Sequence, residues 1–429
     1  MKIAVTGPLA DQNLGDYAMF VNNIYDLGKS HEYSIFHYSG EFVSQLDDDY
    51  FNGFKCKFTD VKFKKSFYIK PSFLSKVVNK LLSLLNLSLA NVIKTPISSE
   101  ILANVENYKD IEATIKQSDV LIVSGGGYFN QLWFEWARRD DLFKILAPIL
   151  IAKKLHKKIV FTANGYGPFD ESDKFFSDFF GGLQNATLGI RDKVLSKTYL
   201  QKLGINNDNF VDLPDDLYLI NSDIVNKNLS EYTKISQQGD YVLLEFYYSL
   251  TWVKNNIDKI QSFVDSIWHN YGYRVVYMPL DHTPVTSYLK STITSDHFNV
   301  IDFSDSYLKI EDAAHMIKNA KSVLCNRYHA LVLSLENKVP VINIMKEVYD
   351  YRYYFNKNYG ILTNAFDGLQ FNEDDFLKIG PEDTLTWYAQ NLKSIIKEQS
   401  QLFATKEYSN NKSKLKGSRD KYLEFIQQK

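Results

Sequence analysis

The segment Arg327-Tyr328-His329 is the strongest candidate for chemistry in the chain. Residues 322–325 predict a strand before it, and residues 330–336 predict a helix after it. Arg327 is a permanent cation whose planar guanidinium binds carboxylates and phosphates, and His329 exchanges a proton near neutral pH. Because a helix N-terminus also favours an anion, the segment predicts a site that holds an anion and transfers a proton.

A second arginine, Arg191, follows an expected strand at 187–190. An arginine at the carboxyl end of a strand suits recognition of a carboxylate or phosphate in a cleft. The alternative is a local ion pair between Arg191 and its neighbour Asp192. We expect Arg191 to bind substrate and to face Arg327 across the cleft.

Three further ionisable candidates follow expected strands in the second half of the chain. Asp281 and His282 come after the strand at 273–278 and predict either proton transfer or a closed turn. Lys346 comes just past the strand at 341–344 and predicts a contact with an anion. We therefore count the first two as catalytic candidates and the lysine as a substrate-binding candidate.

Small and polar residues after other strands predict close approach of the backbone to a ligand. Asn13, Gly15 and Asp16 suit a tight turn and a helix start, whose amides form either an anion site or a plain turn. Glycines leave room for a ligand or for a neighbouring loop. The remaining substrate-binding candidates are Gly125, Gly126 and Gly127 after the strand at 119–123, and Asn164 after the strand at 158–163.

Composition and residue spacing argue against several other classes of site. With 49 Lys and Arg against 51 Asp and Glu, the net charge of −2 provides no basic field for nucleic acid. Two cysteines cannot build a disulfide framework or a thiolate metal site, and the eight histidines show no HxxxH spacing. We expect no metal, no nucleic-acid partner and no bound cofactor.

The length and the alternation of elements predict the architecture. A chain of 429 residues exceeds what one core normally supports, and repeated strand–helix alternation predicts an α/β fold with two doubly wound, Rossmann-like lobes facing a central cleft. The expected divisions are an N-terminal α/β lobe at 1–220 with a basic, aromatic excursion at 51–73, a linker at 221–240, a C-terminal α/β lobe at 241–370 that carries the Arg-x-His segment, and C-terminal helices with a basic tail at 371–429.

Two features bear on location. The chain enters a strand at once and carries no secretory-type apolar segment there, and its most apolar run, 81–93, is too short to span a bilayer. We expect a cytoplasmic protein. The lysines and aromatics of 51–73, with the basic tail, predict either peripheral contact with the inner face of a membrane or a solvated surface on which lysine stems cover apolar atoms.

The order of these segments resembles the polysaccharide pyruvyl transferase family over about residues 1–360. The resemblance implies a fold similar to GT-B glycosyltransferases. It also implies transfer of a pyruvyl group from phosphoenolpyruvate to a sugar of a surface polysaccharide or lipid-linked oligosaccharide, forming a ketal. The family's Arg-x-His residues fall on Arg327 and His329, and its Arg-Asp arginine on Arg191. The matching segments are 13–16, 125–127, 165–169, 191–192, 203–204, 214–215, 327–330 and 339–340.

The sequence departs from the family at Ser334 and Glu336, where small apolar residues are usual, and at 51–73 and the C-terminal tail. These departures leave the acceptor open. The main alternative is a GT-B-type glycosyltransferase, in which Arg327 would neutralise a nucleotide diphosphate and a base near Asp281 or His282 would activate the acceptor. A third is a glycan-binding scaffold without catalysis, against which the presence of both Arg327 and His329 argues.

Overall fold

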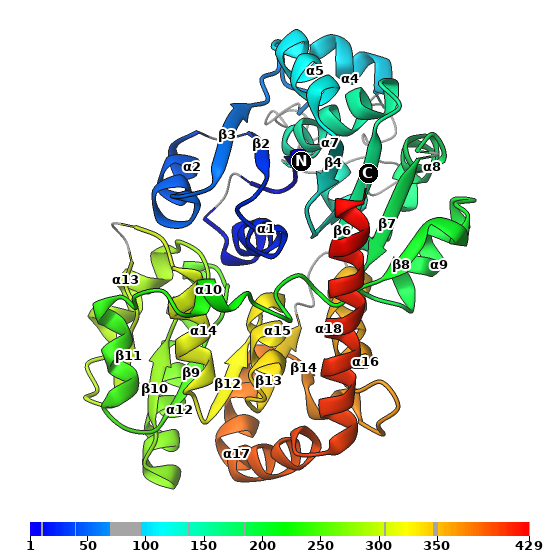
Figure 1. Ribbon diagram of the computed structural model, residues 1–429. Coiled ribbons are helices and arrows are strands. Elements are labelled where there is room, and N and C mark those ends of the chain that lie inside the picture. The colour runs from blue at the N-terminus through cyan, green and yellow to red at the C-terminus, as the bar shows by residue number, and fades with distance from the viewer. Residues whose placement is uncertain are drawn as a thin grey trace, which may run out of the picture.

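The computed structural model describes residues 1–9, 12–38, 40–68, 96–135, 138–183, 185–303, 306–345 and 351–428. Two parallel β-sheets, each covered by helices, form two lobes (Figure 1). The first sheet ends at residue 212 and the second begins at residue 241. The predicted α/β architecture of two doubly wound lobes is confirmed. Lys346 lies outside the described residues.

The N-terminal sheet has the strand order β3-β2-β1-β4-β6-β7-β8, and β5 also pairs with β6. Successive side chains of its central strands enter opposite core layers, as the two-residue period of a strand requires: Val120 packs on the α1 side and Leu121 on the α7 side. The strands are β1 (Lys2–Thr6), β2 (Glu32–His37), β3 (Lys55–Asp60), β4 (Val120–Val123), β5 (Gly126–Phe129), β6 (Lys158–Tyr166), β7 (Ala186–Ile190) and β8 (Phe210–Asp212). The helices are α1 (Leu14–Leu27), α2 (Glu41–Leu46), α4 (Ser98–Asn104), α5 (Tyr108–Gln117), α6 (Gln131–Glu135), α7 (Arg139–Lys154), α8 (Asp173–Gly181) and α9 (Leu195–Lys202).

The C-terminal sheet has the order β11-β10-β9-β12-β13-β14, again parallel throughout. Its strands are β9 (Tyr241–Leu244), β10 (Arg274–Tyr277), β11 (Phe298–Val300), β12 (Ser322–Cys325), β13 (Val341–Met345) and β14 (Leu377–Ile379). Its helices are α11 (Leu250–Asn255), α12 (Ile257–Tyr271), α13 (Pro284–Thr292), α14 (Ile310–Lys318), α15 (Tyr328–Glu336), α16 (Tyr351–Ala365) and α17 (Pro381–Phe403).

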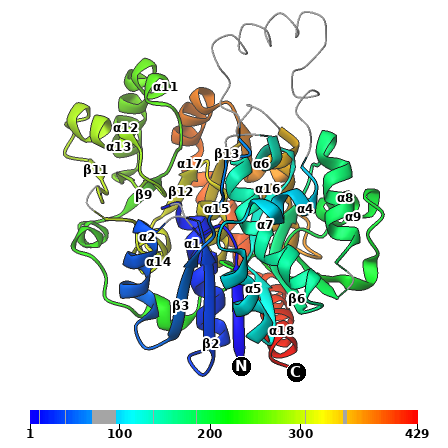
Figure 2. The same ribbon diagram turned by 90° about the horizontal axis from the view of Figure 1, so that it is seen from above.

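The lobes meet through α1 and α15, which lie between the two sheets in both views (Figures 1 and 2). Each of these helices follows an inner strand of its own sheet, β1 or β12. One hydrophobic core cluster runs through both lobes and joins Leu14 and Tyr17 of the first to Leu280 and Leu308 of the second. The N-termini of α1 and α15 are thereby brought together at the carboxyl ends of the strands, where ligands of doubly wound sheets bind.

The predicted excursion at 51–73 is wrong for residues 55–60, which form β3 at the edge of the sheet and pair with β2. Alternation explains the difference: Cys56 and Phe58 are partly buried, whereas Lys55 and Lys57 point to solvent. Lysines are common on edge strands because they discourage pairing with other chains. The part of the stretch beyond residue 68 lies outside the described residues.

The connection between the lobes, predicted at 221–240, contains α10 (Ser222–Val225) and a short 3₁₀ helix (Glu231–Gln237). It is attached to α14 of the second lobe through Asp312. The Asp312 carboxylate accepts hydrogen bonds from the backbone N–H of Ser230 at 2.9 Å and from the hydroxyl of Tyr232 at 2.6 Å. Polar composition here therefore reflects side chains that hold an ordered segment in place.

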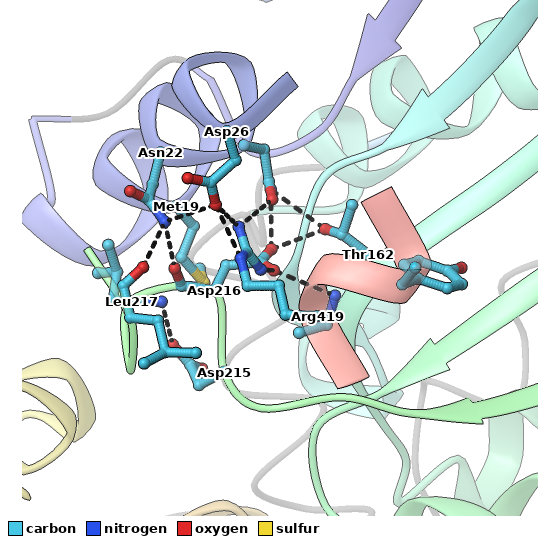
Figure 3. A network of polar contacts seen from close by, with 12 residues as sticks. Met19, Asn22, Asp26, Thr162, Asp215, Asp216, Leu217 and Arg419 are labelled. Atoms are coloured by element: carbon cyan, nitrogen blue, oxygen red, sulfur yellow. Dashed lines mark hydrogen bonds and ion pairs between the residues drawn. The ribbon is translucent and has the colours of Figure 1, made fainter. Parts of the chain in front are cut away.

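The C-terminal helix α18 (Lys406–Gln427) returns to the N-terminal lobe and is not a free basic tail. Near its start, the hydroxyl of Tyr408 donates to the carbonyl of Leu335 in the second lobe. Near its end, the guanidinium of Arg419 is buried between Asp216, at 2.7 Å, and Asp26, at 2.6 Å (Figure 3). The helix that the sequence marked as a basic tail thus contacts both lobes, and its buried Arg419 attaches it to the first.

No helix in the described part of the chain is both long and apolar enough to cross a lipid bilayer.

Replacing Arg419 with methionine is expected to lower the free energy of unfolding by about 3–5 kcal/mol, because Asp26 and Asp216 would be left as uncompensated buried charges. Urea unfolding measures the change. Arg274→Met is the matched control, since its guanidinium bonds Gln238 in an exposed position. A loss no larger than that of the control would contradict the ionic role of Arg419.

Candidate functional site

His329 lies at the contact between the lobes. Its imidazole rests against Gly15 at the start of α1, so closely that a methyl group at position 15 would overlap the ring. Beside it, the backbone N–H of Leu14 donates to the carbonyl of Leu280 at 3.0 Å. Gly15 is therefore required for contact rather than for an unusual backbone conformation, and it positions the imidazole from the opposite lobe.

Arg327, the N-cap residue of α15, is held from three directions. Its Nη2 lies 3.0 Å from Oδ2 of Asp281, its Nε lies 3.9 Å from Oε1 of Glu245, and its guanidinium lies 4.0 Å from the centre of the Tyr247 ring. Asp281 and Arg327, two separate catalytic candidates from the sequence, are thus in direct contact. The guanidinium occupies a defined position between two carboxylates.

Arg191 reaches the same region from the other lobe. Its Nη1 forms a buried ion pair with Asp215 at 2.9 Å, and its guanidinium lies 4.6 Å from the centre of the Tyr328 ring. The carboxylate in this ion pair comes from Asp215 and not from the neighbouring Asp192. The Asp192 carboxylate accepts the backbone N–H groups of Leu195 and Ser196 at the start of α9. The two neighbours therefore have separate tasks, and the arginine is aimed at the second lobe.

Lys357 of α16 is a further cation at the site that the sequence did not single out. Its Nζ lies 5.4 Å from the centre of the Tyr328 ring, so this ring is contacted by both Lys357 and Arg191. Such contacts are attractive because the face of an aromatic ring carries negative charge density. Burial and the nearby Asp215 raise the pKa of the Tyr328 hydroxyl well above its usual value, so Tyr328 stays neutral.

His329 sits in a cationic, poorly solvated environment. Burial lowers the pKa of its imidazole well below the usual value, and Arg191, Lys357 and Arg327 lower this pKa further. Part of the residue remains accessible, but Nε2 is buried and makes no hydrogen bond to any of the described residues. At neutral pH the imidazole is therefore uncharged and able to accept a proton.

The other predicted residues lie in three different places. Asn13 caps α1, accepting from the N–H of Gly15 at 3.3 Å and donating to Asp16 at 3.0 Å, so all three line the start of the helix that contacts His329. His282 is exposed and turned elsewhere: its Nε2 lies 2.6 Å from the carbonyl of Ser306 and its ring contacts Phe303. Among the described residues, no contact joins His282 to the arginines.

The glycine triplet and Asn164 pack inside the N-terminal lobe. Gly125 lies against the Asp216 carboxylate and the carbonyl of Ala163, and residues 126–129 form β5 rather than a turn. Asn164 lies within β6, which extends three residues beyond the expected strand end, and its carbonyl accepts the N–H of Arg191 at 3.1 Å. These residues support the loop that carries Arg191, and the glycines are needed for close packing of the protein itself.

Glu245, Asp215 and Lys357 belong to the site but were not among the candidates. Asp215 was detectable, because it occurs in the 214–215 segment that resembles the family. Glu245 follows β9 directly, yet it stands inside an apolar run that looked like continuing strand. Lys357 had no local signal, since it lies in mid-helix and only the fold brings α16 to the site.

No group of three or more histidine, cysteine, aspartate or glutamate side chains within the described ranges is arranged to hold a metal ion.

The comparison with protein families covers most of the chain. The model of the polysaccharide pyruvyl transferase family matches residues 13–345, which include both arginines and His329. The chain belongs to this family. The transferase matches no curated protein in sequence.

Solved structures show how widely the fold of the transferase is shared. UDP-GlcNAc 2-epimerase from Neisseria meningitidis, bound to UDP-GlcNAc, is 11% identical with a TM-score of 0.57, covering 98% of this chain and 100% of its own. UGT89C1 from Arabidopsis thaliana, complexed with quercetin, is 10% identical with a TM-score of 0.55, covering 97% and 94%. Alr3699/HepE from Anabaena, in complex with UDP, is 9% identical with a TM-score of 0.52, covering 99% of each chain. At these identities the likeness establishes the GT-B-like fold alone.

Substituting Gly15 with alanine is expected to reduce turnover of the transferase by about 100-fold, because the new methyl group would displace the imidazole of His329 by roughly an ångström. The rate is measured with the unfolding temperature beside it. Gly181→Ala is the control, since a methyl group there meets no neighbour. Equal rates in the two variants would show that the Gly15–His329 contact has no catalytic role.

Proposed function

We propose that this transferase moves the pyruvyl group of phosphoenolpyruvate onto a sugar and forms a ketal. The observation that supports it is the pairing of Arg191 and Arg327, from different lobes, around the uncharged imidazole of His329. Phosphoenolpyruvate carries a carboxylate and a phosphate on one three-carbon unit. Two arginines held in fixed positions match two anionic groups, because guanidinium binds each in a planar, bidentate manner.

The chemistry needs one proton donor and two proton acceptors. C3 of the enol takes a proton, C2 forms bonds to two sugar hydroxyls, and the C2–O bond to phosphate breaks. The two hydroxyls release two protons: one balances the proton gained by C3, and the other leaves on the phosphate. An imidazole that starts uncharged suits removal of a hydroxyl proton, so we assign His329 as general base, with Arg327 holding the donor's leaving group.

Asp281 is the competing anion of the site. Its carboxylate occupies Nη2 of Arg327 at 3.0 Å, and about a quarter of its side chain is exposed. An incoming phosphate must displace or share this contact. Asp281 therefore serves as the group that holds Arg327 in place before the donor binds, whereas His282, turned toward Ser306, has no assigned role in the reaction.

The acceptor is assigned to the N-terminal lobe, where Asn13 and Asp16 stand on either side of the Gly15 contact with the imidazole, and to a sugar of a surface polysaccharide or lipid-linked oligosaccharide. A hydroxyl acceptor matches their amide and carboxylate oxygens. No cofactor is required, since the leaving group and the electrophilic carbon both come from the donor.

Glycosyl transfer from a nucleotide sugar is the second candidate, and one observation favours it: two of the solved structures with this fold contain UDP or UDP-GlcNAc. Both reactions use cations at the carboxyl ends of the strands. The fold therefore does not discriminate between them, and the donor must be identified directly.

Thermal-shift titration is expected to show stabilisation by phosphoenolpyruvate and none by UDP-sugars, because only a ligand bound to the folded state raises the unfolding temperature. Mass spectrometry of a lipid-linked oligosaccharide panel should then show a gain of one pyruvyl ketal. A gain of one hexose, with stabilisation by a UDP-sugar instead, would overturn ketal transfer in favour of the second candidate.

His329→Gln is expected to lower turnover by about 10²–10⁴-fold, the usual contribution of a general acid or base. The affinity for phosphoenolpyruvate should stay close to that of the unaltered protein, because the arginines remain. Single-turnover kinetics and a binding isotherm separate the two quantities. Near-normal turnover with normal donor binding would remove His329 from the mechanism.

Peripheral contact with an anionic membrane is proposed for the surface that carries Lys55, Lys57, Lys62, Lys64 and Lys65, all exposed in the structure. The sequence predicted that aromatic residues of 51–73 would share in this membrane contact. Phe63 and Phe67 instead pack against the N-terminal core. Lysine clusters near a membrane are attracted to anionic lipid. The proposal therefore rests on charge alone and concerns a lipid-linked acceptor at the inner face of the membrane.

Neutralising Lys62, Lys64 and Lys65 to glutamine is expected to weaken binding to phosphatidylserine vesicles at low salt by at least about tenfold. Co-sedimentation measures it. The control neutralises three exposed lysines of α14 and α17 in the second lobe, Lys318, Lys393 and Lys397. An unaltered protein that does not sediment with vesicles would rule out the contact.

A further inference from the structure

Glu245 is a buried carboxylate directly after β9, with 1% of its surface exposed. Its Oε2 accepts the backbone N–H of Asn326 at 3.2 Å and the backbone N–H of Arg327 at 2.9 Å. Its other oxygen, Oε1, lies 3.9 Å from Nε of Arg327. Burying a carboxylate is unfavourable unless donors and a cation surround it, and here two amides and a guanidinium do so.

Backbone contacts join the same two loops. The N–H of Glu245 donates to the carbonyl of Leu324 at 2.8 Å, and the N–H of Asn326 is also within 3.2 Å of the carbonyl of Glu245. The N–H of Tyr247 donates to the side chain of Asn326 at 2.8 Å. The loop after β9 and the loop after β12 therefore behave as one unit, which places the Tyr247 ring over Arg327.

This arrangement determines which groups an incoming anion meets. The amides of Asn326 and Arg327, which precede α15, are already occupied by Glu245. The first-turn amides have no partner within their own helix, and the guanidinium meets a ligand by displacing or sharing its contact with Asp281. Glu245 thus fixes both the start of α15 and the orientation of Arg327, although it is too deeply buried to reach a substrate itself.

We propose that Glu245 is the positioning residue of the donor site, holding Arg327 and the first turn of α15 in the geometry that binds the donor's anionic group. Only the naming of that donor as phosphoenolpyruvate rests on the proposed function. The positioning of Arg327 is a property of the two loops and holds for any anionic donor.

Electrostatics and positioning predict opposite signs, which makes the proposal decidable. A carboxylate this close to an anion site repels the ligand, so removing its charge would strengthen donor binding if charge were all that mattered. If position matters more, removing the carboxylate weakens binding despite the lost repulsion. The sign of the change in donor affinity therefore distinguishes the two.

The experiment compares Glu245→Gln, Glu245→Asp and Glu245→Ala by isothermal titration with phosphoenolpyruvate. Glutamine keeps the length of the side chain and one accepting oxygen, but it removes the charge from the two hydrogen bonds to the loop. It is therefore expected to weaken donor binding by about 3- to 10-fold. Aspartate keeps the charge but is shorter by one carbon, and it should be more damaging than glutamine. Glu311→Gln is the matched control, a buried glutamate that bonds Tyr50 away from Arg327.

Two outcomes overturn the proposal: donor binding by Glu245→Gln that equals or exceeds that of the unaltered protein, or normal binding by Glu245→Asp. Amide hydrogen exchange supplies a readout that needs no donor. Protection of the Asn326 and Arg327 amides should fall by about tenfold or more in Glu245→Gln and be unchanged in Glu311→Gln. If the unaltered protein does not bind phosphoenolpyruvate, the proposed function fails while exchange still decides the role of Glu245, and unchanged protection refutes it.

Discussion

The geometry of the site depends on one buried ionic contact, that of Arg419 with Asp216 and Asp26. Asp216 follows Asp215 in the chain, and the two carboxylates point to different partners: Asp216 to Arg419 on α18, and Asp215 to Arg191 at the site (Figure 3). A short turn therefore links the C-terminal helix to the arginine that faces the second lobe. Separating buried charges from their partners would be strongly destabilising, so this turn has little freedom to move.

A second set of contacts fixes the lobes elsewhere. The carboxylate of Asp49 accepts the hydroxyl of Tyr307 at 2.6 Å and pairs with Lys309 at 3.0 Å. These contacts and α18 attach the first lobe to the second at widely separated points of the sequence. The Gly15–His329 contact is consequently held from more than one direction, so the site is assembled from both lobes before any ligand arrives.

Much of the fold was predictable because its signals are local. The apolar run of β4 and the alternation of strands and helices can be recognised from short stretches of sequence. The Arg-x-His segment likewise stands where an expected strand ends and an expected helix begins. The predictions failed where tertiary contacts decide. β3 looked irregular because an edge strand exposes its lysines, and α18 looked like a basic tail because nothing local marks Arg419 as buried.

The site shows the same division. Arg191, Arg327 and His329 were predictable from position alone, since each follows a strand end. Glu245 and Lys357 were not, because a buried glutamate in an apolar run and a lysine in mid-helix acquire meaning only from what lies across from them. Candidate ligand-binding residues can be predicted because they follow strand ends or begin helices. Residues that orient those side chains are recognised by their burial and their contacts, which the sequence alone does not show.

The charges around His329 also suggest an order of events. Burial and three cations hold the imidazole uncharged, and two of these cations already have carboxylate partners, Asp215 and Asp281. A donor with two anionic groups placed against the arginines would add negative charge beside the ring, and nearby negative charge raises the pKa of an imidazole. Donor binding would thus prepare His329 to take a proton from a sugar hydroxyl and retain it. The donor therefore binds before the acceptor reacts. The cations that recognise the donor are the same ones that keep His329 a weak base while the donor is absent.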